Sequence, residues 1–204
     1  MKDQIVFVIL SVVFCPSIRA QTVTVTADAG PGEQISREYM VLDKDCRDLV
    51  SKRANPAETV AACKKVVDEA DKFPAQSHYI TRRSAYVLYT AALIEAKKYQ
   101  DAVKAADTAV NVVLLGHDDS SGSSSAYEAR GQAKALAGDL AGADADLEKA
   151  ETFERNGLIS PAGRALHAEY SRTLKNLLTF HAQVLAAMGK KDAAGIKLEE
   201  ATKL

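Results

Sequence analysis

The sequence has no charge excess of either sign and contains no tryptophan. Its 204 residues carry 26 lysines and arginines against 27 aspartates and glutamates, so no strong field attracts nucleic acid or an anionic membrane. Aromatic residues make up only 6% of the chain, and a chain of this length normally forms one domain with a sizeable core. This composition suits helices that pack closely through alanine, and it predicts that nucleic acid is not a partner.

The motifs that carry common enzyme chemistry are also absent. The four histidines show neither the HExxH spacing of zinc proteases nor a pairing with cysteines. No glycine-rich phosphate loop follows a strand, no GxSxG turn occurs, and the serines at 123–125 have no evident base. We interpret His167 with Glu169, and His181 with Glu199, as solvated or ion-paired side chains on helices. We therefore predict no enzyme activity, no catalytic residue, no metal site and no cofactor.

The first residues have the organisation of an export signal. Met1–Ala20 contains an early lysine, an apolar run over residues 5–14 and a small residue at its end. An apolar run of this length is too short to cross a membrane as a helix. We predict a cleaved signal peptide with Gln21 as the first mature residue, export to the periplasm or the cell exterior, and no stable membrane insertion afterwards. A lipid anchor on Cys15 is the alternative, but the two residues before it are bulky for that processing site.

Residues 21–35 are predicted to be a flexible tether, and residues 36–204 a single helical domain. The tether contains TVTVTA, whose alternation has strand propensity, but one strand without a partner is not stable. The alternative is a strand lent to the edge of a partner's sheet. A second loop is predicted at 115–123 from its glycines and serines. We interpret His117-Asp118-Asp119 within it as a solvated turn, not as metal ligands.

The first two helices are predicted at residues 37–53 and from Pro56 onward. Apolar residues recur at helical spacing over 37–53. Asn55 can cap the second helix, Pro56 suits its first position, and Glu58 stands three residues after the cap. This helix should end before Phe73-Pro74, because a residue preceding proline avoids the helical conformation. The two helices should form a hairpin.

Two of the three cysteines lie at matched positions in this hairpin. Cys46 and Cys63 are equidistant from the turn at Ala54 and Asn55, and equidistant residues of an antiparallel hairpin lie opposite each other. Both lie on the apolar stripes of their helices, so both side chains should face inward. Export would place them in an oxidising compartment, where paired cysteines tend to be bridged. We predict a disulfide between Cys46 and Cys63; two buried free thiols are the alternative.

Ser84–Val110 is predicted to form a second hairpin whose pattern recurs twice downstream. Its first helix should bury the stripe Tyr86, Tyr89, Leu93 and Ile94. Small residues mark its second helix, and the same register returns after a polar or glycine turn at Lys97-Lys98, Gly138-Asp139 and Gly189-Lys190. The three sets are Ala102, Ala106 and Ala109; Ala143, Leu147 and Ala150; and Ala194, Leu198 and Ala201.

Start signals predict the remaining helices. Ser125 and Glu128 have the spacing of a capping box, and the helix that they open should pair with one over 139–153. Ser160-Pro161 should start a long helix that meets no breaker until Gly189. The last helix is predicted at 191–202.

This pattern is similar to the tetratricopeptide repeat, a helix–turn–helix unit of about 34 residues with small and large residues at fixed positions. Tyr86 and Tyr89 match its large apolar positions, and Gly131 matches its close-contact position. Its small site is matched by Ala102, Ala143 and Ala194.

The resemblance implies an all-α fold. This fold would be a right-handed stack of antiparallel helical hairpins, in a short array with a long helix near the C-terminus. The chain departs from the family at Thr90 and Ala182, where a glycine or another very small residue is usual, and no repeat ends in the family's proline. A generic alanine-rich helical bundle is the alternative.

The resemblance also implies a binding function. The first helices of stacked hairpins form a concave surface that holds peptides or helices. The implied groove positions are Val87, Ala91, Glu95, Glu128, Gln132, Leu136, Thr179, Gln183 and Ala187. The family's mode of gripping a C-terminal carboxylate needs lysine and asparagine there, so it is expected to be absent.

We therefore expect an exported scaffold that holds a peptide or protein partner. One alternative is a structural subunit of a cell-envelope complex that assembles through the long helix. A second alternative is small-molecule binding between helices.

Overall fold

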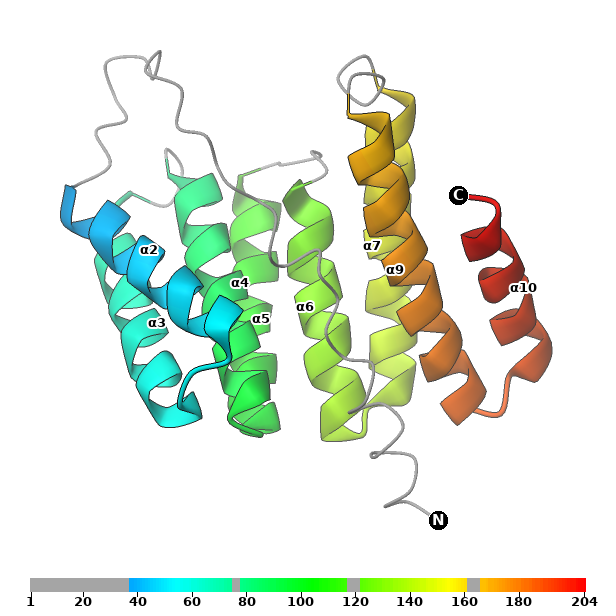
Figure 1. The fold of residues 1–204 in the computed structure, drawn as a ribbon, viewed down its shortest axis with the longest axis horizontal. Coiled ribbons are helices and arrows are strands. Elements are labelled where there is room, and N and C mark those ends of the chain that lie inside the picture. The colour runs from blue at the N-terminus through cyan, green and yellow to red at the C-terminus, as the bar shows by residue number, and fades with distance from the viewer. Residues whose placement is uncertain (1–36, 75–77, 117–121, 161–165) are drawn as a thin grey trace. The chain divides into compact units, whose positions relative to one another are not determined.

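The computed structural model describes residues 37–74, 78–116, 122–160 and 166–204 (Figure 1). Within these ranges the chain forms eight α-helices and no strand, so the predicted all-α fold of helical hairpins is confirmed. The predicted signal peptide, cleavage site and TVTVTA tether, together with His117-Asp118-Asp119, lie outside the described residues. The described helices belong to two compact units that divide after residue 118. Each unit is described by itself below.

The N-terminal unit consists of α2 Arg37–Lys52, α3 Pro56–Ala70, α4 Tyr79–Glu95 and α5 Tyr99–Leu115. The predicted first hairpin is confirmed, because α2 and α3 have nearly the predicted bounds. Asn55 caps α3 as expected: its side-chain oxygen accepts from the backbone nitrogens of Ala57 at 2.9 Å and Glu58 at 3.4 Å. The helix ends at Ala70, before the Phe73-Pro74 pair.

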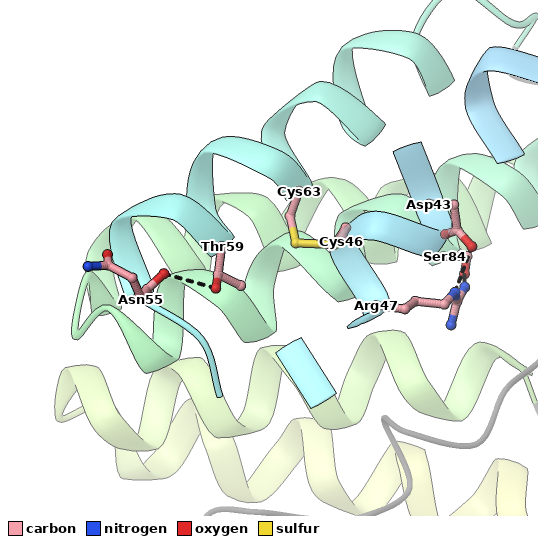
Figure 2. Close-up of a disulfide and its surroundings, with 7 residues drawn as sticks. All are labelled: Asp43, Cys46, Arg47, Asn55, Thr59, Cys63 and Ser84. Carbon is pink, nitrogen blue, oxygen red and sulfur yellow. Dashed lines mark hydrogen bonds and ion pairs between the residues drawn. A yellow bond between two sulfur atoms is a disulfide. The ribbon is translucent and has the colours of Figure 1, made fainter. Parts of the chain in front are cut away.

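The disulfide between Cys46 and Cys63 is confirmed, and it joins α2 to α3 (Figure 2). Both cysteines are fully buried and belong to the core of the unit. The core also contains Tyr39, Val50, Val66, Val67, Ala70, Ala85, Leu88 and Ala92. The bridge therefore links the two helices within the apolar core.

The buried face of α4 differs from the predicted stripe. Ala85, Leu88 and Ala92 form this face with Leu93, whereas Tyr86, Tyr89 and Ile94 are only partly buried. Tyr86 lies at the edge of the core because its hydroxyl donates to Asp71 at 2.8 Å, as expected for an aromatic ring with a polar tip. The buried face of α4 therefore consists of alanines and leucines, and the two tyrosines pack against this core while partly exposed.

The C-terminal unit consists of α6 Gly122–Ala137, α7 Leu140–Ile159, α9 His167–Ala187 and α10 Lys191–Thr202. Within this unit α9 packs against both α7 and α10 (Figure 1). The expected long helix near the C-terminus is confirmed as α9, with 21 residues.

Two predicted helix starts are wrong. α6 begins at Gly122 rather than at Ser125, and the added turn contains two fully buried serines. α7 continues past residue 153 to Ile159, and Ser160 follows it as a C-cap rather than opening the next helix. The extra turns of α7 are stabilised by tertiary contacts, since Leu158 packs on the core of α9 and Arg155 pairs with α10.

One turn geometry closes all four described hairpins. The turn residue has a positive φ in each: 48° at Arg53, 57° at Lys97, 94° at Gly138 and 81° at Gly189. The amide after it bonds to the carbonyl five residues back, from Ala54 to Leu49, Lys98 to Leu93, Asp139 to Lys134 and Lys190 to Leu185. This is the Schellman arrangement. The hairpins are therefore repeats of one unit, and the α2–α3 hairpin is one of them.

The second helices of the hairpins also start alike. In each, a buried small residue donates its backbone N–H to the carbonyl of the capping residue. These residues are Thr59, Ala102, Ala143 and Ala194, so the predicted small sites are confirmed as buried and Thr59 joins them.

The disulfide occupies the closest contact of this repeated hairpin. Cys46 and Gly131 both stand seven residues before the turn residue, and Cys63 and Leu147 both stand four after the small residue. A Cβ placed on Gly131 would lie 3.0 Å from Leu147 Cγ, which shows how closely α6 and α7 approach. One hairpin uses glycine at this contact, and another uses a covalent bond.

Candidate functional site

The nine predicted groove positions lie on the first helices of three hairpins, on α4 in the N-terminal unit and on α6 and α9 in the C-terminal unit. We call these nine positions the groove stripe. Its members stand ten, six and two residues before the turn residues Lys97, Gly138 and Gly189. The members on α6 and the first member on α4 are buried: Val87, Glu128, Gln132 and Leu136. Five members are half-buried: Ala91, Glu95, Thr179, Gln183 and Ala187.

Glu128, which as a groove position should be accessible to a partner, is buried instead. Its exposed fraction is 2%, and its carboxylate accepts from the side-chain amide of Gln132 at 3.1 Å. Reversing this charge would place an unmatched cation in the interior, so the change cannot leave stability untouched. The α6 part of the groove stripe is thus packed inside the molecule. The accessible part lies on α4 and α9, where binding of a partner stays a prediction.

One groove-stripe residue on α9 and one residue outside the stripe on α2 each have a side-chain acceptor without a donor among the described residues. The amide oxygen of Gln183 on α9 is buried and accepts no hydrogen bond. Asp43 stands ten residues before Arg53 on α2, and its Oδ1 is also buried without a donor. Its other oxygen accepts from Arg47 Nε at 2.6 Å, and Arg47 donates further to Ser84 Oγ at 3.0 Å (Figure 2). Such buried acceptors are rare and costly.

A second candidate site lies where α7 meets α9. The His181 ring on α9 is 1% exposed. Its Nδ1 lies 2.5 Å from Glu151 Oε1, and its Nε2 lies 2.7 Å from Asp144 Oδ1, both on α7. We call these three residues the junction cluster. The expectation that His181 and Glu199 form a solvated pair is wrong, because the ring is buried between two other carboxylates.

Two lysines of the α9–α10 hairpin bind the same two carboxylates. Lys190 Nζ lies 2.7 Å from Asp144 Oδ2, and Lys197 Nζ lies 2.5 Å from Glu151 Oε2. Burial alone would raise the pKa of each carboxyl group, but hydrogen bonds from His181 and the lysines outweigh it and lower both pKa values. Both groups are therefore carboxylates that only accept hydrogen bonds.

The hairpin repeat locates this cluster. Asp144 and Glu151 stand one and eight residues after the small residue of α7, and Val60 and Val67 have the same places on α3. His181 stands eight residues before its turn, where α4 has Tyr89. Sequence reasoning missed the cluster, although aligning the hairpins would have shown the two acids of α7 at the places of two valines on α3.

A neighbouring glutamate on α7 has the opposite environment. Glu154 is 3% exposed. Its pKa is raised to about 7, mainly by burial; the Ser124 hydroxyl lowers this pKa, and nearby Glu128 and Glu169 raise it. The pKa of Glu151, one turn earlier, is lowered by Lys197 and His181, whereas no described cation contributes to the pKa shift of Glu154. The contributions of Glu151 and Glu154 to folding stability should therefore change in opposite directions as the pH rises.

The junction cluster is suited to holding helices together rather than to catalysis. Both ring nitrogens of His181 already face carboxylates, so the ring has no nitrogen left to take a proton from a substrate. Among the described residues, no three acids, histidines or cysteines are placed to bind a metal ion. No helix in the described ranges has the length and apolar character needed to cross a membrane.

Comparisons with family models, curated proteins and solved structures find no match to this chain. The resemblance to the tetratricopeptide repeat therefore depends on the residues quoted for it. The shared turn, the buried small residue and the close contact of the hairpins describe an internal repeat without assigning a family.

Proposed function

We propose that this chain is an exported scaffold, similar to tetratricopeptide proteins, that holds a peptide or protein segment on the α9 part of the groove stripe. The observation that carries the proposal is the buried amide oxygen of Gln183, a member of the groove stripe that has no donor among the described residues. An extended peptide presents backbone N–H groups that would satisfy such acceptors.

The chemistry of α9 fits this role. Thr179, Gln183 and Ala187 follow one another at intervals of four residues and are all half-buried. Small and polar side chains at these places allow a backbone to approach the helix. The proposed partner is therefore an extended segment that offers hydrogen-bond donors to α9.

The disulfide supports the exported location. Bridges between cysteines persist in oxidising compartments and are rare where thiols are kept reduced. The bridge of Cys46 with Cys63 lies in the core of the N-terminal unit. The proposed export signal, Met1–Ala20, would bring the chain to such a compartment.

The alternative of an envelope subunit that assembles through the long helix has less support. After the first turn of α9, its exposed residues are Arg172, Lys175 and Ala186. None is a large apolar side chain of the kind that obligate interfaces bury. The surface of α9 therefore favours a reversible peptide contact over a permanent helix interface.

Adjacent alanines on α9 provide a matched test. Ala187 is a half-buried member of the groove stripe, whereas Ala186 is exposed outside it. Residues 21–204 would be immobilised and screened with a displayed random-peptide library. The selected peptides would then be titrated against the Ala187→Arg and Ala186→Arg variants.

We expect the selected peptides to lose about tenfold or more in affinity on Ala187→Arg, because an arginine would block the approach of a backbone. Ala186→Arg should leave their affinity unchanged. Equal effects of both variants, or a library that yields no binders above the empty support, would contradict the proposal.

A further inference from the structure

The junction cluster demands a particular protonation state of His181. Each ring nitrogen faces a carboxylate oxygen at hydrogen-bond distance. A carboxylate has only lone pairs to offer, so both nitrogens must carry a proton to bond. A neutral imidazole has one such proton and would leave one nitrogen lone pair directly against an oxygen. The geometry therefore fits the positively charged ring.

We propose that the junction cluster is a pH-sensitive latch between hairpins of the C-terminal unit. It holds the α9–α10 hairpin on α7 while the His181 ring carries both protons. We call such a contact between the second helix of one hairpin and the first helix of the next a joint, and this joint loosens when the ring loses one proton. The release acts on α9 and α10 together, because Lys190 and Lys197 bind the same carboxylates as the ring.

Among the described residues, the charged groups around the ring come from α7, from Lys190 and from α10. α7 presents Asp144 and Glu151 to the ring. Arg155 on α7 binds Glu151 at 3.3 Å and also pairs with Glu200 of α10. Lys190 and Lys197 complete the surroundings. After loss of the ring proton both acids keep a lysine, so the joint is weakened rather than destroyed.

An ionic joint is not required for this fold. The equivalent places on α3 and α4 are Val60, Val67 and Tyr89, and the tyrosine packs against the core there. Replacing a buried ion cluster with apolar residues is often neutral or stabilising. The same repeat thus has a version of the joint without titratable carboxylates or imidazole, and the charged version adds a response to pH.

Two variants separate the latch from mere stability. In Asp144→Asn, the side-chain amide can donate to a deprotonated Nε2, so the joint no longer needs the second proton. The triple change Asp144→Val, Glu151→Val and His181→Tyr copies the residues of the α3–α4 joint. All measurements would be made in a Glu154→Gln background, because Glu154 also titrates in this range, with a pKa of about 7.

The experiment is hydrogen exchange read by mass spectrometry at pH 6 and pH 9, corrected for the intrinsic exchange rates. We expect opening of α9 and α10 to become about tenfold easier at pH 9, the size expected when a buried polar group loses its partner. Asp144→Asn and the triple variant should lack this change. Nitrogen-15 spectra should show two protonated His181 nitrogens at pH 6.

Equal pH dependence in the parent and in Asp144→Asn would overturn the latch. A neutral His181 ring at pH 6 would overturn it as well. The Asp144→Asn comparison and the nitrogen spectra decide the matter even if the triple variant does not fold.

Discussion

The joint between α3 and α4 and the joint between α7 and α9 use the same positions of one repeat with different chemistry. Val67 of α3 belongs to the apolar core of the N-terminal unit, and Val60 of α3 and Tyr89 of α4 pack against that core. The corresponding residues of the other joint are the two acids and the histidine of the junction cluster. The difference teaches that the hairpin backbone fixes where neighbouring helices meet, and the side chains decide which conditions loosen the contact.

The two units also differ in what closes their hairpins. The α2–α3 hairpin has a covalent bridge at its closest contact, and the α6–α7 hairpin has Gly131 against Leu147 at the corresponding place. Reductant should therefore act on the N-terminal unit, and pH on the C-terminal unit. The following predictions test this contrast, from the largest expected effect to the smallest.

Glu151→Ala should cause the largest loss. Removing one partner of a buried ion cluster typically costs about 3–5 kcal/mol of unfolding free energy, because the ring and lysine lose their acceptor. Val67→Ala at the equivalent place of the other joint should cost less, about 2 kcal/mol. Urea denaturation followed by circular dichroism measures both. Similar losses for the two variants would show that the joints do not differ in kind.

Reducing the disulfide should destabilise the N-terminal unit by about 3 kcal/mol, the value expected from chain entropy for a loop of this length. Exchange of the α2 and α3 amides would report this loss. The C-terminal unit contains no cysteine in its described residues and acts as the internal control. An equal rise in exchange at α6 and α7 would contradict the separation of the two units.

Glu154 should make stability fall as pH rises. Its folded pKa is raised to about 7 from the ordinary 4.5, so the folded state binds the proton more tightly. Its contribution is fully present below about pH 4.5 and is lost as pH rises toward about 7, by up to about 3 kcal/mol. Glu154→Gln should remove this fall.

Glu151 should show the reverse sign. Its pKa is lowered in the folded state, so its contribution is present above the ordinary carboxyl range and lost as pH falls through the folded value. Denaturation curves across pH would measure both acids. A Glu154→Gln variant that keeps the full decrease between about pH 4.5 and pH 7 would count against the assignment.

The smallest effect should come from the helix caps, where the two units should not differ. Asn55 caps α3, and Asp139 caps α7 by accepting from Gly142 N at 2.9 Å. Replacing either residue with alanine should cost about 1 kcal/mol. Thermal melts of the two variants, compared with the parent, would measure both losses of stability. Clearly unequal losses would contradict the prediction and show that the units differ in more than the joints and the bridge.

Local signals in the sequence predicted the first hairpin well. The Asn55-Pro56 cap and the Phe73-Pro74 stop fixed α3, and equal distances from the turn identified the bridge. The same reasoning failed at Ser125, which lies inside α6, and at Ser160, which caps the end of an α7 that tertiary contacts lengthen beyond its predicted bounds. Local patterns specify a helix end only where no neighbour stabilises another turn.

The candidate sites required contacts between hairpins, which single-helix patterns do not contain. The resemblance to the tetratricopeptide repeat placed Glu128 in an accessible groove, yet it is buried. The partners of His181 come from α7, at least 30 residues away in the chain. The only sign of the junction cluster that we find in the sequence is that Asp144 and Glu151 align with two valines of the first hairpin.

The most direct test of the contrast between the units is peptide-level hydrogen exchange of one preparation under two perturbations. Reductant at constant pH should speed exchange in α2 and α3 and leave α9 and α10 unchanged. A shift from pH 6 to pH 9 without reductant, corrected for intrinsic rates, should do the opposite. If both treatments loosen the same helices, the two units do not depend on different chemistry.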